Sequence, residues 1–174
     1  LFLTANNHCL DRYTRGAIRT LHILDSIGAD HIGTYDSKDS FERFYPFITS
    51  IKGIRIAFLN YTYGTNGFTP HSPLIVNYID EEKIKKDIFR AKTLSADLIV
   101  ACLHWGDEYQ LLPNKRQEDL ADFLAKEGVQ LIIGAHPHVI QPMELRYDEQ
   151  GNPCALIVYS LGNFISNMKT RDTV

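Results

Sequence analysis

Two histidines stand one residue apart directly after an apolar segment. Residues 131–139 read Leu-Ile-Ile-Gly-Ala-His-Pro-His-Val. A run of Leu and Ile that ends in glycine is typical of a buried strand, and ligands of open α/β sheets bind at the carboxyl ends of strands. Pro137 favours an extended His136, and residues i and i+2 of an extended chain point to the same side. Two imidazoles aimed at one point predict a metal site. The alternative is a surface loop that contains two histidines.

Two other apolar segments also end in residues that can bind a metal. Residues 1–5 are followed by Asn7 and His8, and residues 97–103 are followed by His104. In a largely parallel sheet the carboxyl ends of the strands lie along one edge, so we expect these side chains to converge with the two histidines above. This coincidence is more specific than any one motif. The remaining histidines lack such a position and are expected to be ordinary surface or half-buried residues: His22, His31 and His71.

The pattern of apolar and turn residues predicts a largely buried sheet with helices around it, an α/β fold. Helices are expected at 13–27, with Thr14 as N-cap and Gly28 as stop, at 81–95 after Asp80, and at 115–127 with Asn114 and Gln117 as a capping box. Strands are expected at 30–33, 47–51, 54–61, 97–103, 129–134, 140–147 and 155–159, and loops at 36–45 and 63–78. No repeat or linker composition divides the chain, so residues 1–174 are interpreted as one domain.

Composition excludes some classes of function. The chain has 174 residues, a net charge of −3 and no basic stripe, which gives no reason to expect nucleic acid or an anionic membrane as a partner. No apolar run approaches the length of a membrane span, and no signal peptide is visible. The three cysteines have neither metal-binding nor redox spacing.

Four motifs in this order resemble one family, the CapA or PGA-cap family of capsule and poly-γ-glutamate synthesis proteins. They are Ala5-Asn6-Asn7-His8 with Asp11, His104-Trp105-Gly106 with Glu108-Tyr109, Gly134-Ala135-His136-Pro137-His138-Val139, and Ser160-Leu161-Gly162-Asn163-Phe164. The family belongs to the calcineurin-like metallophosphoesterase superfamily. The resemblance implies a layered α/β/β/α sandwich with a two-metal site at one edge.

The resemblance also implies roles for individual residues. Asn7 resembles an amide-oxygen metal ligand, and His8 resembles the histidine that faces the substrate and acts as general acid. Three further positions resemble the metal-binding histidines: His104, His136 and His138. Residues expected behind the ligands or facing the substrate are Asp11, Trp105, Glu108 and Asn163. Asp11 either orients His8 or is a cap or turn residue, Trp105 is a pocket wall or a packing residue, and Asn163 is alternatively a residue that satisfies backbone groups at a strand end.

One departure from the superfamily pattern concerns its acidic ligands, which precede the Asn-His motif and are not found here. We therefore expect a fragment of a longer protein that lacks the N-terminal strands, and two divalent ions (Mn, Fe or Zn) in the full-length parent.

The expected function is a metal-dependent hydrolase acting on a small phosphoester or on a γ-glutamyl or cell-envelope polymer. The alternative is a non-catalytic or assisting subunit of a polymer synthesis or export assembly. The expected place is the extracytoplasmic side of the bacterial cell envelope, with a membrane synthesis complex among the expected partners and residues 63–79 and 107–113 facing the substrate.

Overall fold

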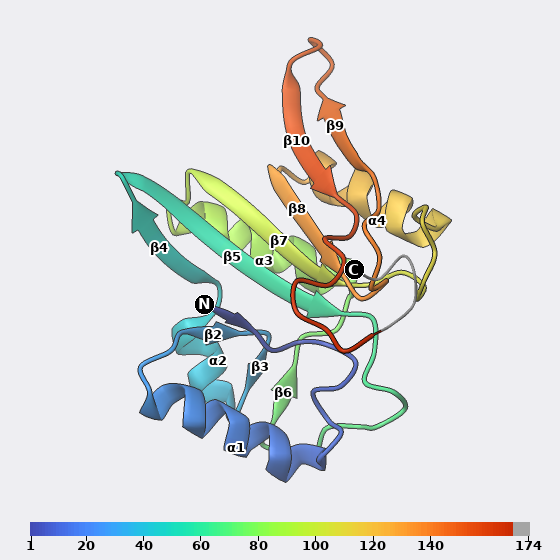
Figure 1. The fold of residues 1–174 in the computed structure, drawn as a ribbon. Coiled ribbons are helices and arrows are strands. Elements are labelled where there is room, and N and C mark those ends of the chain that lie inside the picture. The colour runs from blue at the N-terminus through green and yellow to red at the C-terminus, as the bar shows by residue number, and fades with distance from the viewer. Residues whose placement is uncertain (169–174) are drawn as a thin grey trace.

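A six-stranded sheet forms the centre of the computed structural model, which describes residues 1–168 (Figure 1). In spatial order its strands are β4 (Phe47–Ile51), β5 (Ile54–Thr62), β7 (Leu98–His104), β8 (Leu131–Ala135), β10 (Pro153–Val158) and β9 (Met143–Tyr147). The four inner strands are parallel, and β4 and β9 pair antiparallel at the two edges. The register aligns Thr62 with His104 and His104 with Ala135. Three strands, β5, β7 and β8, therefore end side by side. The sequence predicted this for residues 97–103 and 129–134, but residues 1–5, expected in the same sheet, are not part of it: Phe2–Leu3 pairs with His31–Ile32 in a separate two-stranded sheet.

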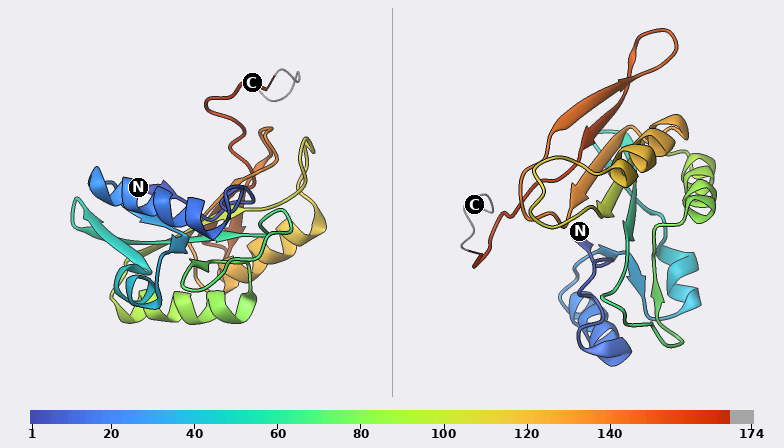
Figure 2. Two further views of the ribbon diagram at one scale, coloured as in Figure 1. Left: turned by 90° about the horizontal axis from the view of Figure 1, so that it is seen from below. Right: turned by 90° about the vertical axis from the view of Figure 1, so that its right-hand side faces the viewer.

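Two helices cover one face of this sheet: α3 (Glu81–Thr93) and α4 (Lys115–Lys126). Their apolar side chains pack on those of the inner strands, including Ile88 and Leu124 against Leu59, Ile99 and Ile132, in one buried cluster. Figure 2 shows both helices on the same side of the sheet. The Asp80 carboxylate accepts from the backbone N–H of Lys83, and Asn114 with Gln117 forms a capping box. Both predicted caps are thus confirmed.

The first part of the chain, residues 1–32, lies on the other side of the sheet (Figure 2). It contains β1 (Phe2–Leu3), α1 (Tyr13–Ser26), and β2 (His31–Ile32), which pairs parallel with β1. The strand expected at 30–33 is interrupted at Gly33, whose φ is +108°, and the chain continues as β3 (Thr34–Tyr35) paired with β6 (Ile75–Val76). A side chain at Gly33 would collide with Ala5 and with the Asn60 amide, so the close approach of two segments requires glycine.

Several expected assignments are wrong. The expected loop at 63–78 contains the short strand β6, and the strand expected from residue 129 begins only at Leu131. Thr14 does not cap α1; its hydroxyl instead accepts from the backbone N–H of His71 at 2.9 Å. The expected loop at 36–45 contains the helix α2 (Lys38–Phe44), capped by Ser37, whose side chain accepts from the N–H of Ser40. The strand expected from residue 140 begins only at Met143, because the preceding Pro142 has no N–H for the ladder. By contrast, Gly28, with a φ of +66°, follows the end of α1 as predicted.

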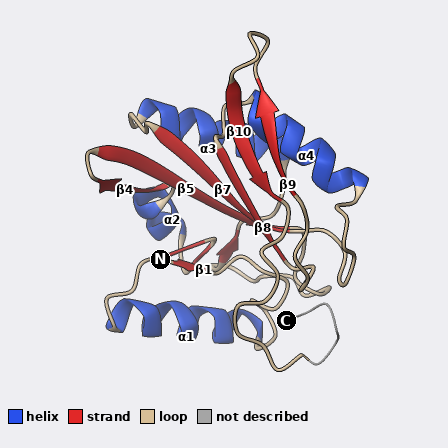
Figure 3. Ribbon diagram, turned by 45° about the horizontal axis from the view of Figure 1, so that its top comes forward, coloured by secondary structure: helices blue, strands red, loops and turns tan. Residues whose placement is uncertain are grey.

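These elements confirm the α/β class, a central sheet with helices, and they fix where the loops gather. Figure 3 shows the tan loops collected where the strands β5, β7 and β8 end. The outer strand β9 leaves Met143, Leu145 and Tyr147 exposed. Among residues 1–168, no helix has the length and apolar character that crossing a membrane requires.

Candidate metal centre

The four predicted ligands meet at the carboxyl ends of the strands. His104 is the last residue of β7, and its Nε2 lies 2.8 Å from Oδ1 of Asn7. The ring centroids of His104 and His136 are 4.8 Å apart, and those of His136 and His138 are 6.2 Å apart. The expected convergence is therefore observed. Metal binding by these four residues remains a prediction.

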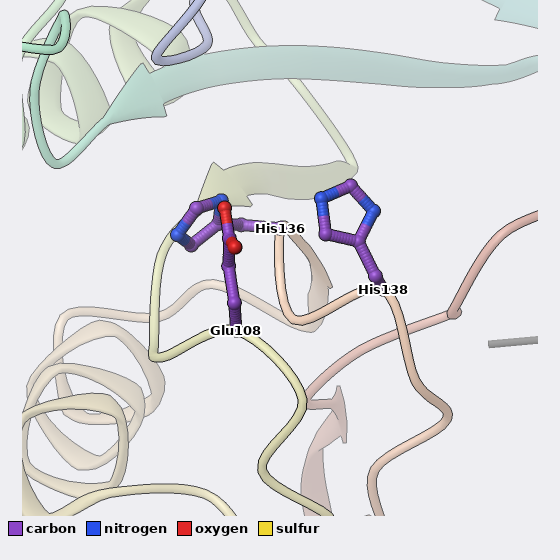
Figure 4. Close-up of side chains that lie close together, drawn as sticks. All are labelled: Glu108, His136 and His138. Atoms are coloured by element: carbon purple, nitrogen blue, oxygen red, sulfur yellow. The ribbon is translucent and has the colours of Figure 1, made fainter. Parts of the chain in front are cut away.

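The carboxylate of Glu108 lies close to the two histidines of the His-Pro-His segment. Glu108, His136 and His138 each offer one ligand atom, and these atoms lie within 4.8 Å of one another (Figure 4). Carboxylate oxygen and imidazole nitrogen together suit Mn, Fe and Zn. The sequence placed Glu108 behind the ligands or facing the substrate, whereas its position makes it a candidate ligand. The signal for it was its place four residues after His104.

The His-Pro-His backbone differs from its prediction. The φ of His136 is +110° and that of His138 is +62°, so His136 is not extended. The segment is held in this form by the Tyr109 N–H, which donates to the Pro137 carbonyl at 2.8 Å. The imidazoles converge through the loop conformation and not through strand alternation. Positive φ is uncommon for residues other than glycine, and such strain concentrates at functional sites.

Burial keeps the central imidazoles neutral. His136 is 8% exposed, and its Nδ1 has no hydrogen-bond partner within residues 1–168. Burial, together with the neighbouring imidazoles, lowers the pKa of His104 to about 3. Burial also lowers the pKa of His136, although the Glu108 carboxylate opposes this shift. Neutral imidazole is the form that binds a metal ion, so both rings are ready to bind one near pH 7.

Neighbouring side chains hold the rings of the candidate ligands. Nδ1 of His138 lies 2.9 Å from Oδ1 of Asn163. The Tyr109 ring stacks on His138, with centroids 6.0 Å apart. Tyr63 lies 4.8 Å from the His136 ring, centroid to centroid. Asn163, a signature residue without an assigned role, thus contacts a predicted ligand.

His8 stands beside the ligands and is paired with Asp11. The His8 Nδ1 and Asp11 Oδ2 atoms are 2.9 Å apart, and both side chains are exposed. Asp11 is also an exposed turn residue, so the contact is compatible with both alternatives for it, and its role in orienting His8 stays a prediction. A carboxylate at Nδ1 holds the proton there and orients the ring, which leaves Nε2 free for proton transfer.

Trp105 is buried and packs against the last strand of the sheet. It is 2% exposed, its Nε1–H donates to the Tyr159 carbonyl at 2.9 Å, and its ring stacks on Tyr159. One edge also borders a hollow beside Tyr63 and Arg116. Trp105 is therefore mainly a packing residue.

Solved structures with this fold define its class. The NAD nucleotidase (NadN) of Haemophilus influenzae superimposes with a TM-score of 0.58 at 14% identity, over 90% of this chain and 29% of that one. A 5'-nucleotidase precursor from Thermus thermophilus gives 0.57 at 16% identity, over 92% of this chain and 33% of that one. The chain therefore shares its fold with these two nucleotidases.

Sequence comparison then gives the family. The model for "Bacterial capsule synthesis protein PGA_cap" matches residues 1–168, and the chain belongs to this family. "Capsule biosynthesis protein CapA" of Bacillus anthracis is 32% identical over 182 residues, 97% of this chain and 41% of that protein. "PGA biosynthesis protein CapA" of Bacillus subtilis (strain 168) is 32% identical over 190 residues, 98% of this chain and 44% of that protein. The chain thus spans less than half the length of these relatives.

Proposed function

We propose that this chain carries the metal centre of a metal-dependent hydrolase of capsule biosynthesis. One observation carries the proposal. At the carboxyl ends of β5, β7 and β8, amide, imidazole and carboxylate groups converge beside the His8–Asp11 pair. The proposed substrate is a small phosphoester, or a γ-glutamyl or other cell-envelope polymer. The names of the two relatives support this substrate class, since one states capsule biosynthesis and the other PGA biosynthesis.

We propose the following roles for residues of this chain. The residues proposed to hold a divalent ion (Mn, Fe or Zn) are Asn7, His104, Glu108, His136 and His138. A bound ion supplies positive charge that polarises the substrate and activates water. His8, oriented by Asp11, would give a proton from Nε2 to the leaving group. Tyr63 and Tyr109 would limit how far the imidazoles turn.

We further propose that a second ion is bound when acidic ligands from a longer protein complete the site. Two ions a few ångströms apart repel each other, and a carboxylate between them relieves that repulsion. The proposed location is the extracytoplasmic side of the bacterial cell envelope, with a capsular polymer or a membrane synthesis complex as partner, in keeping with the names of the two relatives. This expectation rests on the family resemblance.

A second candidate is a non-catalytic or assisting subunit of a polymer synthesis or export assembly. One observation favours it. Within residues 1–168, Glu108 is the carboxylate grouped with the candidate ligands, and the other four are neutral amide or imidazole groups. Such a set suits one ion better than two, and one ion can serve structure or binding as well as chemistry.

The test compares turnover with metal content. His8→Asn in the metal-loaded protein should lower hydrolysis of a chromogenic phosphodiester or of γ-glutamyl oligomers by ~10²–10⁴-fold with bound metal unchanged. Asp11→Asn should lower it less, because the general acid itself remains. His22→Asn is the matched control, since His22 forms another His–Asp pair, with Asp36, outside the site. Metal-loaded protein that hydrolyses neither substrate favours the second candidate.

A further inference from the structure

A tight turn beside the site is determined by its own residue types. The loop after β5 reverses at Thr65–Phe68, where the Phe68 N–H donates to the Thr65 carbonyl at 2.9 Å. Asn66 and Gly67 occupy the central positions with φ of +49° and +80°. Positive φ at both central residues is the mark of the type I′ turn, for which Asn-Gly is a preferred pair. The dipeptide therefore fixes the backbone from which the Asn66 side chain projects.

Packing on both sides holds this turn in place. Thr65 is buried, and its hydroxyl lies 2.9 Å from the hydroxyl of Tyr78. The Phe68 ring meets the Tyr13 ring edge-on, with centroids 5.4 Å apart. The turn thus joins the segment before α3 to the start of α1, and Asn66 is held between them.

Asn66 contacts the amide of a proposed metal ligand. Its Oδ1 accepts from Nδ2 of Asn7 at 3.2 Å, and Oδ1 of Asn7 lies 2.8 Å from Nε2 of His104. Asn7 is 4% exposed, so an unpaired amide there would be costly. An amide has one oxygen and one NH2 group, and the NH2 can donate but cannot bind a cation. Whichever group faces Asn66, the other faces His104.

From this geometry we infer that Asn66 is a positioning residue, one that turns the Asn7 oxygen toward His104 and toward an ion bound there. In the orientation observed, Asn66 offers an acceptor to Nδ2 and so disfavours the flipped Asn7 amide, which would present NH2 to the cation. Its own Nδ2 lies 3.5 Å from Nδ1 of His8, but that nitrogen has the closer Asp11 carboxylate as partner, at 2.9 Å. The consequence for the metal rests on the proposed function; the orientation of Asn7 does not.

Two substitutions distinguish the effect of the Asn66 side chain from that of the backbone turn. Asn66→Gly keeps the turn, because glycine adopts positive φ without strain, but it removes the acceptor. Asn66→Asp keeps both, because aspartate tolerates positive φ and its carboxylate accepts a hydrogen bond. Both variants should fold. If the metal-free proteins unfold at the same temperature, differences in zinc affinity or in the His104 tautomer arise at the site and not from lost stability.

Zinc calorimetry on the full chain gives the first readout. We expect Asn66→Gly to bind Zn²⁺ about 10- to 100-fold more weakly than wild type, and Asn66→Asp to retain affinity within a few-fold. A merely structural role predicts no such rescue. Wild-type affinity in Asn66→Gly, or equal weakness in both variants, would overturn the inference.

The tautomer of His104 in metal-free protein gives the second readout. Because Asn7 presents an oxygen, His104 should carry its proton on Nε2 in wild type and in Asn66→Asp, as seen by nitrogen–proton NMR correlations. In Asn66→Gly the Asn7 amide is released, and the tautomers should mix. An unchanged tautomer in Asn66→Gly rejects the inference. If wild type binds no zinc, the proposed function fails, and the tautomer alone decides the role of Asn66.

Discussion

Oδ1 of Asn163 lies 2.9 Å from Nδ1 of His138, at the point where the chain passes the site after the sheet is complete. The bond leaves Nε2 as the nitrogen of His138 that is free to bind an ion. Partners behind a ligating imidazole fix its tautomer and its direction. Because His138 sits in a loop at positive φ, this side-chain bond and the Tyr109 ring limit its rotation.

Asn163→Leu should therefore weaken Zn²⁺ binding by about 10- to 100-fold, because His138 loses the partner that fixes its ring. Asn163→Asp keeps an acceptor and should recover most of the affinity. Asn167→Leu is the control, because Asn167 is exposed on the same segment. Calorimetry on the three variants measures the effect. Equal affinities for Asn163→Leu and Asn167→Leu would show that the bond does not support metal binding.

Glu108→Gln should reduce zinc affinity more than the adjacent Asp107→Asn. Glu108 lies in the three-residue group with His136 and His138, whereas the Asp107 carboxylate accepts from the Asn114 side chain at 2.7 Å. Both changes remove one negative charge near the imidazoles, so the difference between them isolates direct ligation. Elemental analysis after dialysis should find about one zinc per wild-type chain and less in Glu108→Gln. If the two variants lose zinc equally, Glu108 acts only through its charge.

The pattern of apolar runs predicted the side chains that follow parallel strand ends, and the family resemblance named Asn7, His138 and Asn163 in loops; the contacts between loops were not predicted. The positions of His104 and His136 follow from apolar runs that end at one edge of the sheet. The sequence does not indicate helix α2, because the third helical residue of its capping box is Ser40 and not the usual Glu or Gln. The contact of Asn66 with Asn7 arises from loops that only the tertiary fold brings together, and no local pattern specifies it.

Stability of the metal-free protein should fall as the pH decreases from about 6.5 to about 3. The pKa of His104 is lowered from 6.5 to about 3, so the unfolded chain binds a proton in this window that the folded chain does not. Bound protons then favour unfolding, by at most about 1.4 kcal/mol per pH unit for one group. Above 6.5 both states are neutral at His104 and the dependence vanishes.

His104→Gln should reduce this slope and keep an amide donor for Asn7, while His71→Gln, at an exposed position, should not. The measurement is urea unfolding at several pH values with a chelator present. Part of the slope should survive in His104→Gln, because burial also lowers the pKa of His136. An identical slope in His104→Gln and wild type would contradict the prediction.

Gly134→Ala should destabilise the fold, whereas Gly64→Ala should not. A Cβ at Gly134 would overlap the Tyr159 carbonyl and Nε1 of Trp105, where the indole already donates to that carbonyl. The clash is with the backbone directly after β10, which has little room to move aside, so overpacking should cost about 1–3 kcal/mol of unfolding free energy. Gly64 has open space around it, and its φ is not in the left-handed region. The single tryptophan reports urea unfolding by fluorescence. Since His136 follows two residues later, zinc affinity should fall together with stability. Coincident unfolding curves for the two alanine variants would show that the close packing of β8 on the indole does not constrain the site.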